Sequence, residues 1–107
     1  MELNQYEIVL VNLDPTIGSE VKKTRPCLIL SPDEMNRHIQ TIVIAPITSS
    51  SKNYPTRIEL QGKTTKGWVM IDQMRTIDKR RILKVFHKIS VEEIKNVKTV
   101  IRETFVD

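Results

Sequence analysis

The stretch YEIVLVNLDPTIGSEVKKTRPCLIL, residues 6–30, joins two strand-like runs through a polar loop. Residues 6–12 are apolar and β-branched, and the run stops at the turn sequence Asp-Pro-Thr. Pro26 then opens residues 27–30, which are apolar at every position and indicate a buried strand that begins with its proline. The polar residues 14–24 between the runs predict an exposed loop.

The rest of the chain predicts mostly further strands. Their runs are rich in β-branched residues or alternate between apolar and polar positions, and they lie at 41–46, 56–60, 67–72 and 85–89. Ser31 before Pro32, with Glu34 three places on, predicts a capped short helix through about Arg37. Asp78 can cap a second short turn over residues 79–82.

The segment after residue 89 predicts an amphipathic helix. Ser90 and Glu93 form the pattern of a capping box. Apolar residues then recur at steps of three and four, at Ile94, Val97, Val100, Ile101 and Phe105. We expect most of this stripe to pack into the core. With five or six strands and two short helices, the chain is predicted to be β-rich α+β: a small, curved sheet or barrel packed by the terminal helix, as one domain over residues 1–107.

Composition narrows the function. Seventeen Lys and Arg against thirteen Asp and Glu give a net charge of +4, which favours polyanionic partners such as nucleic acid but equally fits a solvated basic surface. The single cysteine, Cys27, excludes an internal disulfide and suits a reducing compartment. Neither a signal peptide nor a membrane span is indicated, so we expect a cytoplasmic protein that does not contact a membrane.

Several kinds of active site are disfavoured. His38 and His87 are separated and have no carboxylate pattern beside them, so no metal site is predicted. The three glycines are scattered, so there is no phosphate-binding glycine loop and no cofactor is expected. Cys27 lies in an apolar run, where a thiolate would be disfavoured, and is predicted to be a core residue.

Three polar segments next to strand ends suit phosphate chemistry, and they lie at residues 22–25, 48–52 and 72–76. RNA carries its own nucleophile, the 2′-hydroxyl, so a protein can cleave it by positioning the phosphodiester and stabilising charge. Arg25 offers a planar, permanently charged fork, and Thr48 a hydroxyl that can donate to the same phosphoryl group. Each segment alone also fits a surface charge or a flexible turn.

Taken in order, four stretches of the chain resemble the MazF/Kid/PemK family of bacterial toxins. These stretches are LDPTIGSEVKKTRPCLILSP at 13–32, VIAPITSS at 43–50, YPTRIEL at 54–60 and KGWVMIDQMRTID at 66–78. The resemblance spans nearly the whole chain and implies an SH3-like barrel, a homodimer and a metal-independent, sequence-specific endoribonuclease. Such an enzyme cleaves single-stranded mRNA to a 2′,3′-cyclic phosphate and a 5′-hydroxyl, which inhibits translation and growth.

The resemblance also implies partners and site residues. The partner is an antitoxin of a type II toxin–antitoxin pair, whose acidic, disordered tail wraps a basic groove and through which alone DNA would be contacted. The family's Thr-Arg-Pro arginine matches Arg25, and the threonine of its Pro-x-Thr segment matches Thr48. Arg25 would stabilise the phosphorane, and the group that takes the 2′ proton is left open. Residues expected to contact RNA are Ser19, Glu20, Lys22, Lys23, Ser49, Ser50, Lys52, Asn53, Asp72, Gln73 and Arg75.

The chain departs from the Kid branch at two positions. That branch has His where this chain has Ser19 and Arg where it has Met70, so this sequence leans to the MazF branch. Asp72 does match the Kid aspartate, which leaves an acid/base role beside a structural, hydrogen-bonding role.

Two other functions compete. The same fold family includes the gyrase poison CcdB, but its activity needs a terminal Trp-Gly-Ile, whereas this chain ends Glu-Thr-Phe-Val-Asp. An SH3-like peptide-binding module would need an aromatic groove, and the aromatic residues here are spread through the chain.

Overall fold

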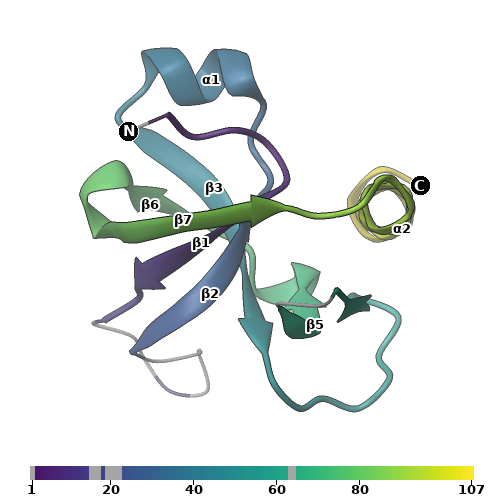
Figure 1. Ribbon diagram of the computed structural model, residues 1–107. Coiled ribbons are helices and arrows are strands. Elements are labelled where there is room, and N and C mark those ends of the chain that lie inside the picture. The colour runs from purple at the N-terminus through teal and green to yellow at the C-terminus, as the bar shows by residue number, and fades with distance from the viewer. Residues whose placement is uncertain (1, 15–17, 19–22, 63–64) are drawn as a thin grey trace.

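The computed structural model describes residues 2–14, 18, 23–62 and 65–107. Seven strands lie in these residues: β1 (Glu7–Asn12), β2 (Thr24–Ile29), β3 (Thr41–Thr48), β4 (Arg57–Gln61), β5 (Lys66–Met70), β6 (Arg75–Asp78) and β7 (Ile82–Lys88). The helices are α1 (Asp33–His38) and α2 (Val91–Ile101), and the single helical turns are η1 (Ile71–Gln73), η2 (Lys79–Arg81) and η3 (Arg102–Val106). Figure 1 shows α1 and α2 on separate sides of the strands.

The strands form one antiparallel sheet in the order β4-β5-β3-β2-β1-β7, and β6 also pairs with β3. The long strand β3 changes partner along its length. Thr41–Ile44 pair with β6, whereas Ile47 and Thr48 pair with β5. Between them lies Pro46, which has no N–H to donate to a neighbouring strand. The sheet therefore bends within β3 and encloses a core on each face.

Each face of the bent sheet carries its own hydrophobic cluster. One cluster gathers Val9, Val11, Cys27 and other side chains of β1, β2, β3 and β6. The other gathers Leu28, Ile47, Val69 and other side chains of β2 to β5, and Val97 of α2 closes it. Because neighbouring residues of a strand point to opposite faces, Cys27 and Leu28 enter different clusters. The predicted β-rich architecture with a terminal packing helix is confirmed.

Two of the three predicted helix caps are confirmed and one is wrong. Asp78 caps η2 by accepting from the Arg80 N–H at 2.8 Å. Ser90 accepts from the Glu93 N–H and the Glu93 carboxylate accepts from the Ser90 N–H, so the capping box of α2 is confirmed. The prediction for Ser31 is wrong, because α1 begins after Pro32 with no side-chain cap. Ser31 is buried instead, donating to Asn36 Oδ1 at 2.6 Å and accepting from the Val43 N–H.

Several predicted boundaries need correction. β2 begins at Thr24 rather than at Pro26, because Thr24 and Arg25 pair with Asn12 and Val11 of β1. Residues 71–72, predicted as strand, lie in η1. Residues 75–78 form β6, although residues 75–76 belong to the polar segment 72–76 and no strand is predicted there. β7 starts at Ile82, earlier than predicted. Phe105, expected on the core stripe, is 54% exposed within η3.

Candidate active site

Arg25 and Thr48, the two predicted catalytic residues, lie across from each other on neighbouring strands. The β2–β3 ladder pairs Ile29 with Ile44, Leu28 with Ala45 and Cys27 with Pro46. Continued by two residues, this register puts Arg25 opposite Thr48, and directly opposite side chains of antiparallel strands share a face. The recorded pairing stops at Cys27–Pro46, so the two residues lie where the strands separate.

The Arg25 guanidinium makes no hydrogen bond or ion pair with the described residues. Arg25 is half-buried, and its Nε is fully buried without a hydrogen-bond partner. Leaving a buried donor unsatisfied costs about 1–3 kcal/mol. Such a donor is set up to bind an anionic acceptor that arrives from outside, because its cost is recovered when the acceptor binds.

Arg75 adds a second cation to the same face. Its β6 position is opposite Ile44, which belongs to the cluster that contains Cys27. Burial raises the pKa of the Cys27 thiol to about 12, although the nearby positive charges of Arg75 and Arg25 act against that rise. Both arginines therefore lie near one thiol. Cys27 is fully buried, which confirms the prediction that it is a core residue.

Thr48 is held at the site by close contact with β5. Its hydroxyl donates to the Ser50 carbonyl at 3.1 Å. On the other side, Gly67 has φ +148°, and a β-carbon at that residue would lie 2.6 Å from the Thr48 carbonyl oxygen. Only glycine permits β5 to approach Thr48 this closely. The backbone at Thr48 is thereby fixed from two directions.

The loop after Thr48 carries four of the residues expected to contact RNA. All four are exposed: Ser49, Ser50, Lys52 and Asn53. Between them Ser51 is half-buried; its hydroxyl donates to the Lys52 carbonyl and accepts from Arg57 Nη1 at 2.9 Å. The loop is thus anchored through its centre, with the expected contact residues facing solvent on either side.

Arg57 and Asp72 form a bidentate ion pair beside the loop that follows Thr48. Arg57 Nε and Nη2 each donate to a different Asp72 oxygen, at 3.1 Å in both cases. Thr56 donates to the same carboxylate, and the Tyr54 ring lies 4.9 Å from the guanidinium carbon. The hydrogen bond from Arg57 is the main cause that lowers the pKa of Asp72. Both oxygens are engaged inside the protein, which fits the structural role better than the acid/base role.

The other residues expected to contact RNA are divided between elements. Gln73 follows Asp72 in η1, and Arg75 is in β6. Lys23 is exposed at the start of β2 with φ +66°, and its N–H donates to Asp14 Oδ1 at 2.9 Å. Ser19, Glu20 and Lys22 lie outside the described residues.

Three residues that sequence reasoning missed support these loops. Arg57 anchors the loop after Thr48, and Arg81 donates to the Asn12 and Asp14 carbonyls at the base of the loop after β1. Trp68 pairs with Thr48 across β5 and β3. Arg57 and Trp68 each lie within the family-like segments, but neither residue's role could be read from spacing because each depends on contacts between strands.

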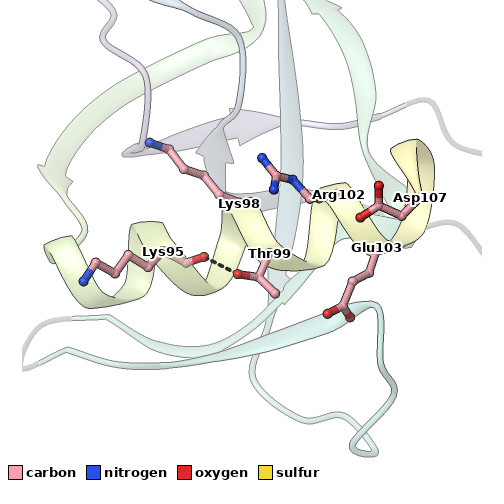
Figure 2. A pocket seen from close by; sticks show the side chains of 6 residues that line it. All are labelled: Lys95, Lys98, Thr99, Arg102, Glu103 and Asp107. Carbon is pink, nitrogen blue, oxygen red and sulfur yellow. Dashed lines mark hydrogen bonds between the residues drawn. The ribbon is translucent and has the colours of Figure 1, made fainter.

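A separate hollow lies along the C-terminal helical segment. Its lining comes from α2 and η3: Lys95, Lys98, Thr99, Arg102, Glu103 and Asp107. Figure 2 shows these side chains along one stretch of the helix, where Thr99 donates to the Lys95 carbonyl at 3.0 Å. None of the predicted site residues lines it. It is therefore distinct from the Arg25–Thr48 site.

Within the described part of the chain, no three His, Cys, Asp or Glu side chains gather to form a metal-binding group. His38 of α1 lies 3.4 Å from the Glu34 carboxylate, and both side chains are largely exposed. No helix in the described residues is long and apolar enough to span a membrane.

Fold and site together define a small β-rich protein with two arginines and a threonine on one face, suited to a phosphodiester. Comparison with known proteins agrees. The family model for the PemK-like, MazF-like toxin of type II toxin–antitoxin systems matches residues 4–105. This chain therefore belongs to that toxin family.

Individual relatives show how far the likeness extends. Endoribonuclease PemK of Escherichia coli is 39% identical over 82 residues, which are 72% of this chain and 62% of the relative's length. The crystal structure of MazF from Deinococcus radiodurans has a TM-score of 0.87 at 26% identity, over 96% of each chain. A mycobacterial endoribonuclease in complex with its cognate antitoxin has a TM-score of 0.82 at 18% identity, over 94% of this chain and 92% of that one, and shares the fold.

Proposed function

We propose that this chain is a metal-independent, sequence-specific endoribonuclease that cleaves single-stranded mRNA and acts as the toxin of a type II toxin–antitoxin pair. One observation carries the proposal: Arg25, whose buried Nε has no hydrogen-bond partner among the described residues, lies opposite Thr48 when the β2–β3 register is continued by two residues. Membership of the toxin family supports it, as does the endoribonuclease activity in the printed name of PemK. The same membership disfavours the gyrase inhibitor.

The proposed reaction uses the substrate's own 2′-hydroxyl. The 2′ oxygen gives up its proton to a base and forms a bond to phosphorus as the bond to the 5′ oxygen breaks. The 5′ oxygen takes up a proton, and the products are a 2′,3′-cyclic phosphate and a 5′-hydroxyl. Negative charge grows on the phosphoryl oxygens in the transition state, and the Arg25 fork can donate to two of them. The Thr48 hydroxyl turns from the Ser50 carbonyl to donate to the same group. Arg75 adds positive potential to this face.

The two flanking loops would select the bases. Ser49, Ser50 and Asn53 carry hydroxyl and amide groups suited to base edges, whereas Lys23 and Lys52 attract phosphates. The anchored Ser51 keeps the second loop near the scissile phosphate. Ser19, Glu20 and Lys22 keep the contact role expected for the first loop, and Gln73 that expected beside Asp72.

The proposal includes the assembly and its location. Residues 1–107 act as one toxin domain that forms a homodimer in the cytoplasm. The cognate antitoxin contributes an acidic, disordered tail that binds the basic face and alone connects the toxin to DNA. The net charge of +4 supports this pairing.

Incubation of purified protein with a long RNA in EDTA tests the activity. The parent protein is expected to cut at defined sites and to leave cyclic phosphate ends detectable by mass spectrometry. Arg25→Ala is expected to slow the cutting strongly, while Arg37→Ala, which removes an exposed arginine of α1, leaves it intact. No cutting by the parent, or equal cutting by Arg25→Ala, would refute the proposal.

Two substitutions of Thr48 separate its hydroxyl from its place in β3. Thr48→Ser keeps a donor and is expected to retain cleavage, while Thr48→Ala is expected to lose most of it. Both variants are expected to keep the parent's circular dichroism spectrum. Equal rates for the two variants would remove the hydroxyl from the mechanism.

A further inference from the structure

A row of side chains crosses four neighbouring strands at the level of the candidate active site. Glu59 of β4 pairs with Trp68 of β5, and Trp68 pairs with Thr48 of β3. The β2–β3 register then adds Arg25. Since directly opposite residues of antiparallel strands share a face, Trp68 is next to Thr48 on the side away from Arg25.

Two surface hollows meet at Trp68. One, of about 480 Å³, is lined by Trp68, Ser49 and Glu59 together with Lys66 and neighbouring residues. The other, of about 440 Å³, is lined by Trp68 and Glu59 with Asn53, Arg57 and, from α2, Asn96 and Thr99. Trp68 is half-buried, so part of its side chain faces these hollows. Each hollow also contains one residue of the loop that follows Thr48.

The chemistry of these groups matches a nucleobase. Single-stranded RNA is recognised by stacking its bases on aromatic side chains and by hydrogen bonds to the exposed base edges. Trp68 supplies the aromatic surface, and Asn53, Glu59 and Asn96 supply donors and acceptors around it. Thr48 lies one β-strand away from Trp68 and Arg25 two β-strands away. If these two residues hold the phosphate, the base of a nucleotide beside that phosphate is placed to reach Trp68.

We propose that Trp68 is the stacking platform for the nucleobase adjacent to the scissile phosphate. The proposal rests on the ribonuclease activity proposed above and adds a binding residue to it. The substrate would then contact the face of β4 and β5 that carries Glu59 and Trp68, next to the loop expected to contact base edges.

The chain offers a direct probe, because Trp68 is its only tryptophan. The ligand in the test is an RNA oligonucleotide spanning a mapped cut site, with a 2′-deoxy nucleotide 5′ of the cut so that it cannot be cleaved. Saturable quenching of tryptophan fluorescence is expected on titration. An abasic nucleotide at one position beside the cut is expected to remove the quenching, and abasic nucleotides further away to preserve it. No quenching, or quenching independent of the abasic position, would overturn the proposal.

Steady-state kinetics supply a second measurement. Trp68→Ala is expected to raise KM by about 5- to 100-fold, the range for losing one stacked base, with a smaller change in kcat. Trp68→Phe keeps a ring and is expected to recover most of the loss. Phe86→Ala removes an exposed aromatic of β7 and is the matched control, with KM unchanged.

The two proposals fail in different ways. If the parent protein does not cut RNA, the proposed function is refuted. If it cuts RNA but Trp68→Ala keeps the parent KM, only the stacking role is refuted. Should Trp68→Ala fail to fold, the fluorescence titration of the parent protein still decides the matter.

Discussion

Arg25 and Arg57 are both half-buried arginines near the start of a strand, yet their guanidinium groups differ in their hydrogen bonding. Arg57 donates to both oxygens of Asp72 and to Ser51, so each of its three side-chain nitrogens makes a hydrogen bond within the protein. Arg25 has a buried Nε without a partner. Burial alone therefore does not identify a functional arginine. The arginine with unused donors can bind substrate, whereas the arginine with occupied donors holds a loop.

Replacing Arg25 gives the largest expected effect of the comparison. Arg25→Ala is expected to lower the cleavage rate by roughly 10²–10³-fold, as for loss of one preorganised donor. Its thermal unfolding midpoint is expected to equal or exceed the parent's, because no bond with the described residues is lost and one unsatisfied donor is removed. Cleavage assays check the rate, and calorimetry checks the unfolding midpoint. A large loss of stability would make Arg25 a structural residue.

Replacing Arg57 is expected to reverse the pattern. Arg57→Ala leaves the Asp72 carboxylate without its fork and releases Ser51, so the free energy of unfolding is expected to fall by about 1–2 kcal/mol, allowing for solvent screening of the partly exposed pair. Arg57→Lys keeps the positive charge but not the planar guanidinium, so its free energy of unfolding is expected to lie between those of the parent and Arg57→Ala. Urea unfolding of the parent, Arg57→Lys and Arg57→Ala measures the order of their stabilities. An unchanged midpoint for Arg57→Ala would contradict the prediction.

The Arg57–Asp72 pair also predicts that stability depends on pH. The expected change in the free energy of unfolding is smaller than the one caused by removing the Arg57 guanidinium. Arg57 lowers the pKa of Asp72, so the carboxylate stabilises the folded chain fully above its ordinary value of 3.8, and this is lost as pH falls through the lowered pKa. The stability difference between the parent and Asp72→Asn is thus expected to stay level from about pH 7 to 5 and to shrink below 3.8. Asp78 and Glu93, whose pKa values are also lowered, are present in both proteins and cancel. A difference that already changes between pH 5 and 7 would assign the effect to another group.

Arg37 gives the smallest expected effect and shows what an arginine contributes when it is merely exposed. It pairs with Glu34 at 3.2 Å, but both side chains are more than half exposed. Arg37→Ala is expected to change the free energy of unfolding by less than about 0.5 kcal/mol and the cleavage rate not at all. Thermal unfolding and the RNA assay check this, and an effect as large as that of Arg57→Ala would undermine the argument from bonding.

Local sequence signals predicted much of the fold. The β-branched runs located most of the strands, and the pattern at Ser90 and Glu93 located the start of α2. The similar pattern at Ser31 failed because its hydroxyl is used by Asn36 and Val43, which lie elsewhere in the structure. β6 was missed because four residues, two of them charged, carry too little apolar pattern. It forms because β3 offers an edge to pair with.

The candidate site was predicted in part. The ordered motifs selected Arg25 and Thr48, whose proximity depends on a strand register that no local pattern encodes. The contacts between Arg57 and Asp72, 15 residues apart, arise from the β4–β5 hairpin and the turn that follows it. The family-like motif distinguished Arg25 from Arg57, but whether an arginine's donors are occupied is a property of the folded chain and could not be predicted from either motif.

The close approach of Gly67 to Thr48 also has a genetic consequence. Every missense change of a glycine codon adds at least a β-carbon, and here that atom would meet the Thr48 carbonyl oxygen. If expression of this chain arrests growth, survivors selected from a random mutant library would include many different amino acids at residue 67. Among variants that keep the activity, only glycine would be found at residue 67.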